Sequence, residues 1–166
     1  KLEDSGWLVG TSGNMSIRNE GDGAMLMTPS GINYQRMKTE DLLRIEADGR
    51  VVLGTGKPTS SLAFHRRIMK ERADCMVVLH THAPYATAAS TIVMEVPPVT
   101  LPTAFYLGGS IRVSPYAENG SEQEAENIAK ALGSDRQGML MQNTGDVAIG
   151  KNLEDAWLNM AHLEEC

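Results

Sequence analysis

The chain has 166 residues, of which 42% are hydrophobic, and this composition excludes a disordered protein and predicts a globular fold with a sizeable core. The formal net charge of −6, with no run of Lys or Arg, argues against nucleic acid and membrane surfaces as main partners. Two cysteines, Cys75 and Cys166, are too few for a disulfide framework, which predicts a cytoplasmic location.

Two hairpins are predicted near the N-terminus. In residues 14–28, Met15 and Ile17 alternate with polar residues, the turn sequence NEGDG follows, and the apolar sequence AMLM returns. Residues 42–53, LLRIEADGRVVL, show the same arrangement with Asp-Gly at the turn.

The central part of the chain combines helical and buried-strand signals. A helix should follow the sequence KPTSS, with Ser60 or Ser61 as its N-cap. Residues 75–82, CMVVLHTH, have the continuous apolar character of a buried strand. Residues 83–91 predict the start of another helix.

A capped helix is predicted over residues 121–133, where Ser121 and Glu124 form a capping box and Gly133 ends the helix. Residues 138–143 and residues 146–150 predict two strands, and a last helix is predicted from Asn152 onward. Hairpins mixed with helices predict an α/β fold with a largely antiparallel sheet. We expect residues 1–166 to be a single domain, truncated at both ends, because the chain begins without Met and stops within a helical pattern.

His80 and His82 stand one residue apart at the end of the apolar sequence VVLHTH. Residues i and i+2 of a strand point to the same face, so both imidazoles can converge on one divalent metal such as zinc. A catalytic site also needs a third protein ligand, which this spacing does not supply. The alternative is a pair of structural histidines at a strand end.

Three short sequences are rich in small and hydroxyl-bearing residues: GTSGN at 10–14, TPSG at 28–31 and KPTSS at 57–61. Loops of this composition can bind a phosphate through backbone N–H and hydroxyl donors. The third loop adds a cation and precedes a helix N-terminus, which also favours anions. The alternative is ordinary turn formation, because Ser, Thr, Gly and Pro are common in turns.

The motifs of the chain are, in order, GTSGNMSIR, TPSG, KPTSS followed by FH, VVLHTH and MLMQNTGDVAIGKNLEDA. Through these motifs the chain resembles the class II aldolase/adducin family over most of its length. The resemblance implies an α/β fold of three layers, α/β/α, around a mainly antiparallel central sheet. It also implies a homotetramer with the active site at the subunit interface. The ligands that it implies are a divalent metal, usually zinc, and a phosphorylated sugar.

The resemblance also assigns roles to single residues. The phosphate-binding positions that it implies are Thr11, Gly13 and Asn14 in the first loop, Ser30 and Gly31 in the second, and Thr59 and Ser60 in the third. His80 and His82 match two of the family's three metal-binding histidines.

Two positions depart from the family pattern. This chain has Thr144 where the family has its third histidine, and Ser61 where the family has an acid/base carboxylate. Thr is not among the usual zinc ligands, and a Ser hydroxyl cannot transfer protons as a tuned carboxylate does. Asp146, two residues beyond Thr144, could supply a metal-binding carboxylate if both residues lie on one strand.

These observations leave three functions open. The first is a metal-dependent aldolase- or epimerase-like lyase, in which the metal stabilises the enediolate of a sugar phosphate or a related hydroxy-carbonyl compound. The second is a non-catalytic, adducin-like binding or scaffold domain that has lost the third histidine and the carboxylate. The third is a different reaction on the same scaffold, such as decarboxylation. Metal binding is expected to be weak.

Overall fold

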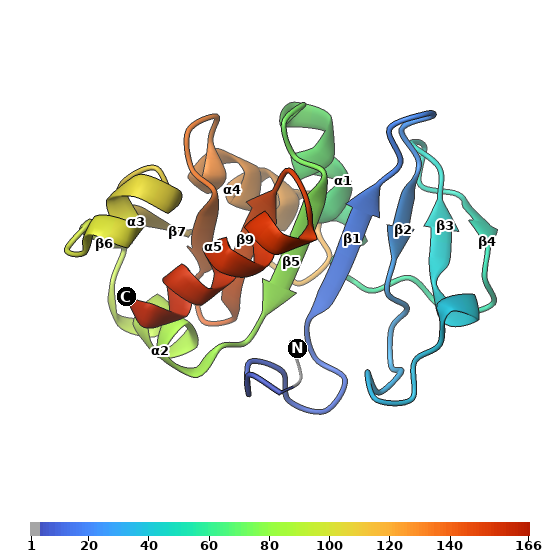
Figure 1. Cartoon of the computed structure of the whole chain (residues 1–166), viewed down its shortest axis with the longest axis horizontal. Helices are drawn as coiled ribbons and strands as arrows, with labels where there is room; N and C mark the ends of the chain where they lie inside the picture. Colours follow the sequence, from blue (N-terminus) through green and yellow to red (C-terminus); the bar gives the residue numbers. More distant parts are fainter. Residues whose placement is uncertain (1–3) are drawn as a thin grey trace.

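The structure is a computed structural model, and it describes residues 4–166. Within these residues, one sheet of nine strands runs through the molecule in the order β4-β3-β2-β1-β5-β9-β8-β7-β6 (Figure 1). The strands are β1 (Asn14–Arg18), β2 (Met25–Met27), β3 (Leu43–Ile45), β4 (Val51–Leu53), β5 (Val77–Thr81), β6 (Glu95–Val96), β7 (Ile111–Ser114), β8 (Gly138–Met141) and β9 (Gly145–Gly150).

Helices accompany the sheet in the described part of the chain. They are α1 (Leu62–Glu71), α2 (Pro84–Ile92), α3 (Leu101–Tyr106), α4 (Glu122–Leu132), α5 (Leu153–Glu165) and the short 3-10 helix η1 (Thr39–Asp41). Among residues 4–166, none of these helices is both long enough and apolar enough to cross a bilayer.

The sheet is mainly antiparallel, as the sequence predicts. Among the described strand pairs, only β7 and β8 run parallel. Both predicted hairpins are confirmed, because β1 pairs with β2 and β3 pairs with β4. The four helices predicted from periodicity and capping are also present, as α1, α2, α4 and α5.

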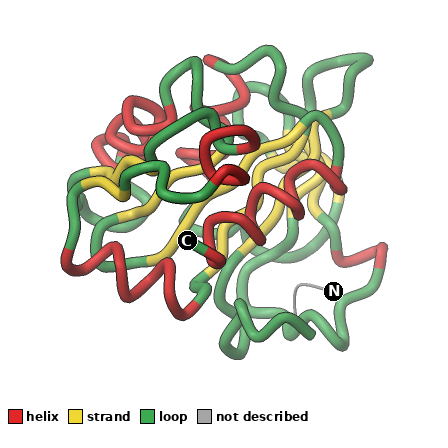
Figure 2. The backbone as a smooth tube through the Cα atoms, turned by 60° about the vertical axis from the view of Figure 1, so that its left-hand side comes forward, coloured by secondary structure: helices red, strands yellow, loops and turns green. Residues whose placement is uncertain are grey.

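The sheet lies between two helical layers, which Figure 2 shows on either side of the strands. Side chains alternate along β5, so Val78 and His80 face α1 and α4, whereas Leu79 and Thr81 face α5. This burial on both faces explains why β5 is continuously apolar in sequence. The three-layer α/β/α architecture implied by the resemblance is therefore confirmed. Each helical layer packs on the sheet to form a hydrophobic core. Helices α1 and α4 contribute side chains to one core, among them Phe64, Ile68, Ile128 and Leu132. Helices α2 and α5 contribute to the other, among them Ala86, Ala156, Met160 and Leu163.

Three elements between α2 and α4 were not predicted from the sequence: β6, α3 and β7. α3 has only six residues, and its N-cap is Thr100, whose hydroxyl accepts a hydrogen bond from the Thr103 amide at 3.3 Å. Pro102 lies in its first turn, a position that tolerates proline. These short elements show neither a helical period nor the hairpin turn residues that identify β1 to β4, so the sequence does not indicate them.

Ser61 occupies the predicted N-cap position of α1, but its hydroxyl does not cap the helix. Its Oγ accepts a hydrogen bond from Asn14 Nδ2 at 3.0 Å instead. The sequence therefore predicted the position correctly and the role of the side chain wrongly, because a partner distant in sequence determines that role.

Candidate active site

A cavity of about 320 Å³ brings together the loops and histidines that the sequence singles out. These parts converge because β1 pairs with β5, which places Asn14 opposite His80. Gly31 and Asp146 do not line the cavity. The sequence-predicted residues that do line it are Thr11, Gly13, Asn14, Ser30, Thr59, Ser60, Ser61, His80, His82 and Thr144.

Hydrogen bonds fix the three loops relative to one another. The Ser30 amide donates to Lys57 O at 2.8 Å, which joins the second loop to the third. The Tyr34 hydroxyl donates to Gly13 O at 2.6 Å, which anchors the first loop. Gly13 has a φ of +75°, and a Cβ there would lie 2.7 Å from His80 O. Glycine is therefore required for the first loop to approach β5 this closely.

The two imidazoles lie side by side, with ring centroids 4.9 Å apart. Asp146 O lies 2.8 Å from His80 Nδ1. A carbonyl oxygen can only accept, so Nδ1 carries the proton and Nε2 keeps its lone pair. Burial lowers the pKa of His80 to about 4, and burial also lowers the pKa of His82. Both rings are therefore neutral at neutral pH and can serve as ligands or hydrogen-bond acceptors.

His65 was not assigned to the site from the sequence, but it is buried behind the cavity and contacts Asn14, which lines it. Its Nε2 lies 2.6 Å from Asn14 Oδ1, and its Nδ1 lies 2.6 Å from Ser16 Oγ. The amide oxygen can only accept, so Nε2 carries the proton and Nδ1 accepts from the serine hydroxyl. Burial holds the pKa of His65 well below its usual range. Its spacing of four residues from Ser61, on one face of α1, was a usable sequence signal.

Asn14 connects His65 to the third loop through hydrogen bonds. Its Nδ2 donates to Thr59 Oγ1 at 3.2 Å and to Ser61 Oγ at 3.0 Å. Thr59 Oγ1 also accepts from the Ser61 amide at 3.2 Å. A hydroxyl oxygen accepts two hydrogen bonds, so the Thr59 hydroxyl proton is left to donate to a ligand.

The donors around His80 and His82 do not fit a three-ligand metal centre. Thr144 lines the cavity, but its hydroxyl donates to Gln142 O at 3.2 Å. In the described part of the chain, no three side chains of His, Cys, Asp or Glu are placed to hold one metal ion. Catalytic zinc sites use three protein ligands, so two imidazoles alone make a weak site.

Asp146 does not supply the missing ligand, which corrects the interpretation of the sequence. It pairs with Thr81 across β5 and β9, and its Oδ1 accepts a hydrogen bond from the Thr81 hydroxyl at 2.6 Å. Its side chain therefore faces α5, on the opposite side of the sheet from His80. Because β9 begins at Gly145, Thr144 lies in the preceding turn and does not share a strand face with Asp146.

Glu124 is a cavity-lining carboxylate whose place in the site was missed. Ser121 caps α4 as predicted, with its hydroxyl accepting from the Glu124 amide at 3.1 Å. The carboxylate, however, accepts from the Gly120 amide at 2.8 Å, so the predicted reciprocal bond to the Ser121 amide is wrong. Burial raises the pKa of Glu124.

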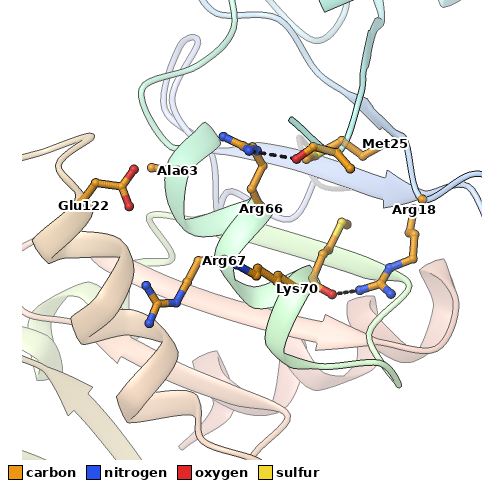
Figure 3. Close-up of a pocket in the computed structure, with 10 residues that line it drawn as sticks. Arg18, Met25, Ala63, Arg66, Arg67, Lys70 and Glu122 are labelled. Carbon is orange, nitrogen blue, oxygen red and sulfur yellow. Dashed lines mark hydrogen bonds between the residues drawn. The ribbon is translucent and has the colours of Figure 1, made fainter. Parts of the chain in front are cut away.

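A second, larger cavity of about 490 Å³ lies beside α1 (Figure 3). Four cations line it, Arg18, Arg66, Arg67 and Lys70, together with Glu122 of α4. Neither the imidazoles nor the hydroxyl-rich loops line this cavity. The smaller cavity, which collects these groups, is therefore the candidate active site, and we call it the histidine cavity.

Comparisons with known proteins place the chain among proteins of known activity. Residues 1–166 match the family model described as "Class II Aldolase and Adducin N-terminal domain". A 5-deoxy-D-ribulose 1-phosphate aldolase of Bacillus thuringiensis serovar kurstaki is 34% identical over 166 residues, which are 100% of this chain and 77% of that protein. An L-fuculose phosphate aldolase of Escherichia coli K12 is 37% identical over 150 residues, covering 90% of this chain and 68% of that protein.

Solved structures show the same likeness. A structure of an L-fuculose 1-phosphate aldolase superposes with a TM-score of 0.92 at 31% identity, and the match covers 99% of this chain and 76% of that chain. An L-fuculose-1-phosphate aldolase from Thermus thermophilus gives a TM-score of 0.85 at 27% identity, over 99% of this chain and 84% of that chain.

Proposed function

This chain belongs to the class II aldolase and adducin family, and we propose that it is a sugar-phosphate lyase that works in the histidine cavity. The observation that carries the proposal is the convergence of three hydroxyl-rich loops and two neutral imidazoles on one cavity. Several similar proteins are named as aldolases of ketose phosphates, which supports the same class of substrate here.

The phosphate would be bound by neutral donors. Among the described residues that line the cavity there is no Lys or Arg, so within one chain hydroxyl and backbone N–H groups supply the contacts. Thr59, whose hydroxyl proton is left to donate, is the residue best prepared for this role. Anchoring the phosphate in the loops would place the reacting carbons beside the imidazoles, where their geometry is fixed.

For zinc, we propose weak binding by His80 and His82. Replacing Thr144, which lines the same cavity, with histidine should supply a third imidazole and tighten zinc binding by more than about tenfold. Titration of the metal-free protein with zinc, followed by calorimetry, measures the change. The surface substitution Lys151→His is the matched control, and equal affinity in both variants would contradict the assignment of these ligands.

A second function remains supported by one observation: Ser61 stands where the resemblance implies an acid/base carboxylate, and its hydroxyl is held by Asn14. A non-catalytic, adducin-like domain would bind the phosphorylated sugar and leave it intact. Binding without turnover would favour this function over the lyase.

Calorimetry with L-fuculose 1-phosphate and 5-deoxyribulose 1-phosphate, paired with detection of the released aldehyde, tests the proposal. We expect binding and slow release of aldehyde, and no binding of the same sugars without phosphate. Thr59→Val should weaken binding, whereas Lys70→Ala, which changes only the larger cavity, should not. Equal binding of phosphorylated and unphosphorylated sugars would contradict the phosphate-binding role of the loops.

We further propose a homotetramer with its active site at the subunit interface and a cytoplasmic location. Large apolar side chains stand exposed in and around α3, which supports burial of this segment in an assembly; they include Ile92, Val99, Leu101 and Phe105. Cys75 and Cys166 are both free thiols, as expected in a reducing compartment.

A further inference from the structure

The histidine cavity contains one carboxylate with an oxygen available to a ligand, that of Glu124. The side chain is 7% exposed and extends from the first turn of α4. Its Oε2 accepts the Gly120 amide at 2.8 Å, whereas no hydrogen bond or ion pair to its Oε1 is present among residues 4–166. Oε1 is therefore free to accept a hydrogen bond or a proton from a ligand in the cavity.

The backbone places Glu124 against the third loop. A Cβ built on Gly120, the residue that binds the carboxylate, would lie 3.1 Å from Ser60 O. Gly120 therefore lies beside the backbone of Ser60, and Glu124, Ser60 and Ser61 all line the histidine cavity. The Glu124 side chain enters the cavity from α4, and a side chain at position 61 enters the same cavity from the start of α1.

The surroundings of Glu124 favour proton transfer over ion pairing. No described Lys or Arg forms an ion pair with it, and no hydrogen bond joins it to either imidazole. The titratable side chains that line the cavity with it are His80, His82 and Tyr116. On α1, which packs against α4, Arg67 pairs with Glu71. Burial raises the pKa of Glu124, and a carboxyl group works best as both acid and base when its pKa lies close to the working pH.

We propose that Glu124 is the proton-transfer group of the histidine cavity, in the role that the resemblance gives to a carboxylate at the position of Ser61. This inference rests on the proposed lyase function. The carboxylate removes the proton from the substrate hydroxyl at the carbon that becomes the aldehyde. The carbon–carbon bond breaks, and its electron pair passes to the carbon beside the carbonyl. After the aldehyde leaves, Glu124 returns the proton to that carbon, so no oxidant or reductant is consumed.

The decisive variant is Glu124→Gln, which keeps the size of the side chain and an oxygen that can accept the Gly120 amide. Turnover of L-fuculose 1-phosphate or 5-deoxyribulose 1-phosphate should fall by about 10²–10⁴-fold. Binding of the same compounds and the urea midpoint should stay close to those of the wild type. The acidic limb of the kcat/KM profile should disappear, which loss of a merely structural carboxylate would not cause.

The double variant Ser61→Glu with Glu124→Gln tests the exchange of roles. It restores a carboxylate to the cavity from α1, so it should recover at least a tenth of the turnover lost in Glu124→Gln. Exchange of carbon-bound hydrogen of dihydroxyacetone phosphate in D2O, followed by NMR, reports the proton-return step without cleavage, and Glu124→Gln should abolish it.

The outcomes separate the two proposals. If the wild type shows turnover or hydrogen exchange and Glu124→Gln leaves both unchanged, the role of Glu124 is overturned, and the lyase function is not. Wild-type protein that binds the ketose phosphates but shows neither turnover nor exchange overturns both the role of Glu124 and the lyase function in favour of a binding domain. Wild-type protein that binds none of them overturns the proposed function and the role of Glu124 with it.

Discussion

Asn14 connects two parts of the molecule that are distant in sequence. Its amide oxygen accepts from His65, and its amide nitrogen donates to Thr59 and Ser61. Both groups of this side chain are therefore engaged, and the imidazole behind it has no replacement donor or acceptor if the amide is lost. A buried polar group without its partner costs more free energy than an ordinary hydrogen bond contributes.

Asn14→Ala should therefore lower the free energy of unfolding by about 1–3 kcal/mol. It should also weaken binding of a phosphorylated sugar, because Thr59 and Ser61 lose the contact that orients them. Urea unfolding and calorimetry measure the two effects, and the exposed substitution Gln35→Ala is the control. An unchanged urea midpoint would show that the hydrogen-bond chain contributes nothing to stability.

Asp146 makes the stability of the fold depend on pH. Its pKa is about 7 in the folded protein because of burial, and near 3.9 in an unfolded chain. Between these values the unfolded chain releases the proton while the folded protein keeps it, so this group lowers stability as pH rises, by about 1.4 kcal/mol per unit. The buried neutral imidazoles of His65 and His80 act in the opposite direction below about pH 6.5.

The substitution Asp146→Asn isolates the contribution of the carboxyl group. It keeps an oxygen that can accept from Thr81 and removes the titration. Relative to the wild type, the variant should gain stability from about pH 4 to pH 7 and keep that gain above pH 7. Urea unfolding of both proteins at pH 5 and pH 8 gives the comparison. The same difference at both pH values would mean that Asp146 ionises normally in the folded protein.

At the scale of elements, the site depends on how closely the first loop approaches β5. Gly13→Ala would place a Cβ against Leu8 Cδ2 and 2.7 Å from His80 O, at a positive φ. We expect a loss of at least about 1 kcal/mol and weaker binding of phosphorylated sugars, because the loop must move away from the cavity. Gly10→Ala is the control, since its Cβ meets open space at a similarly positive φ. If both variants behave alike, conformational strain rather than close approach is the cause.

Elements with a complete local pattern were predictable from the sequence. Period-two alternation with turn residues identified both hairpins, and capping residues identified α4 and α5. α3 and β7 were not predictable, because one has six residues and the other depends on its parallel pairing with β8. The hypothesis that Asp146 binds the metal assumed that Thr144 and Asp146 lie on one strand, but Thr144 lies in the turn before β9 and Asp146 faces α5.

The residues of the candidate site were likewise predictable only where they belong to a local sequence motif. His80, His82 and the three loops were identifiable because each has its own short motif, and the structure brings them to one cavity. Glu124 was missed because its role depends on contacts across the fold, whereas His65 was missed although its spacing from Ser61 gave a local signal. Glu124 in particular satisfies a local capping pattern, and only the placement of α4 beside the third loop brings it into the cavity.

At the scale of the whole molecule, the exposed apolar side chains around α3 predict self-association. Leu101→Ser combined with Phe105→Ser should convert the proposed tetramer into smaller species, because two exposed apolar anchors are lost. Light scattering after size-exclusion chromatography measures the molar mass. Leu153→Ser, at the exposed start of α5, is the control. An unchanged mass would place the subunit interface elsewhere, and a monomeric wild type would contradict the tetramer itself.

The absence of Lys and Arg among the described residues that line the histidine cavity has a kinetic consequence. A chain with a formal net charge of −6 repels a phosphate dianion at long range, and the described lining of the cavity in one chain offers no cation to reverse that field. Capture then depends on hydrogen bonds that act only at contact. The rate of association should therefore rise as salt screens the repulsion, the reverse of the behaviour of enzymes that steer anionic substrates with a basic funnel.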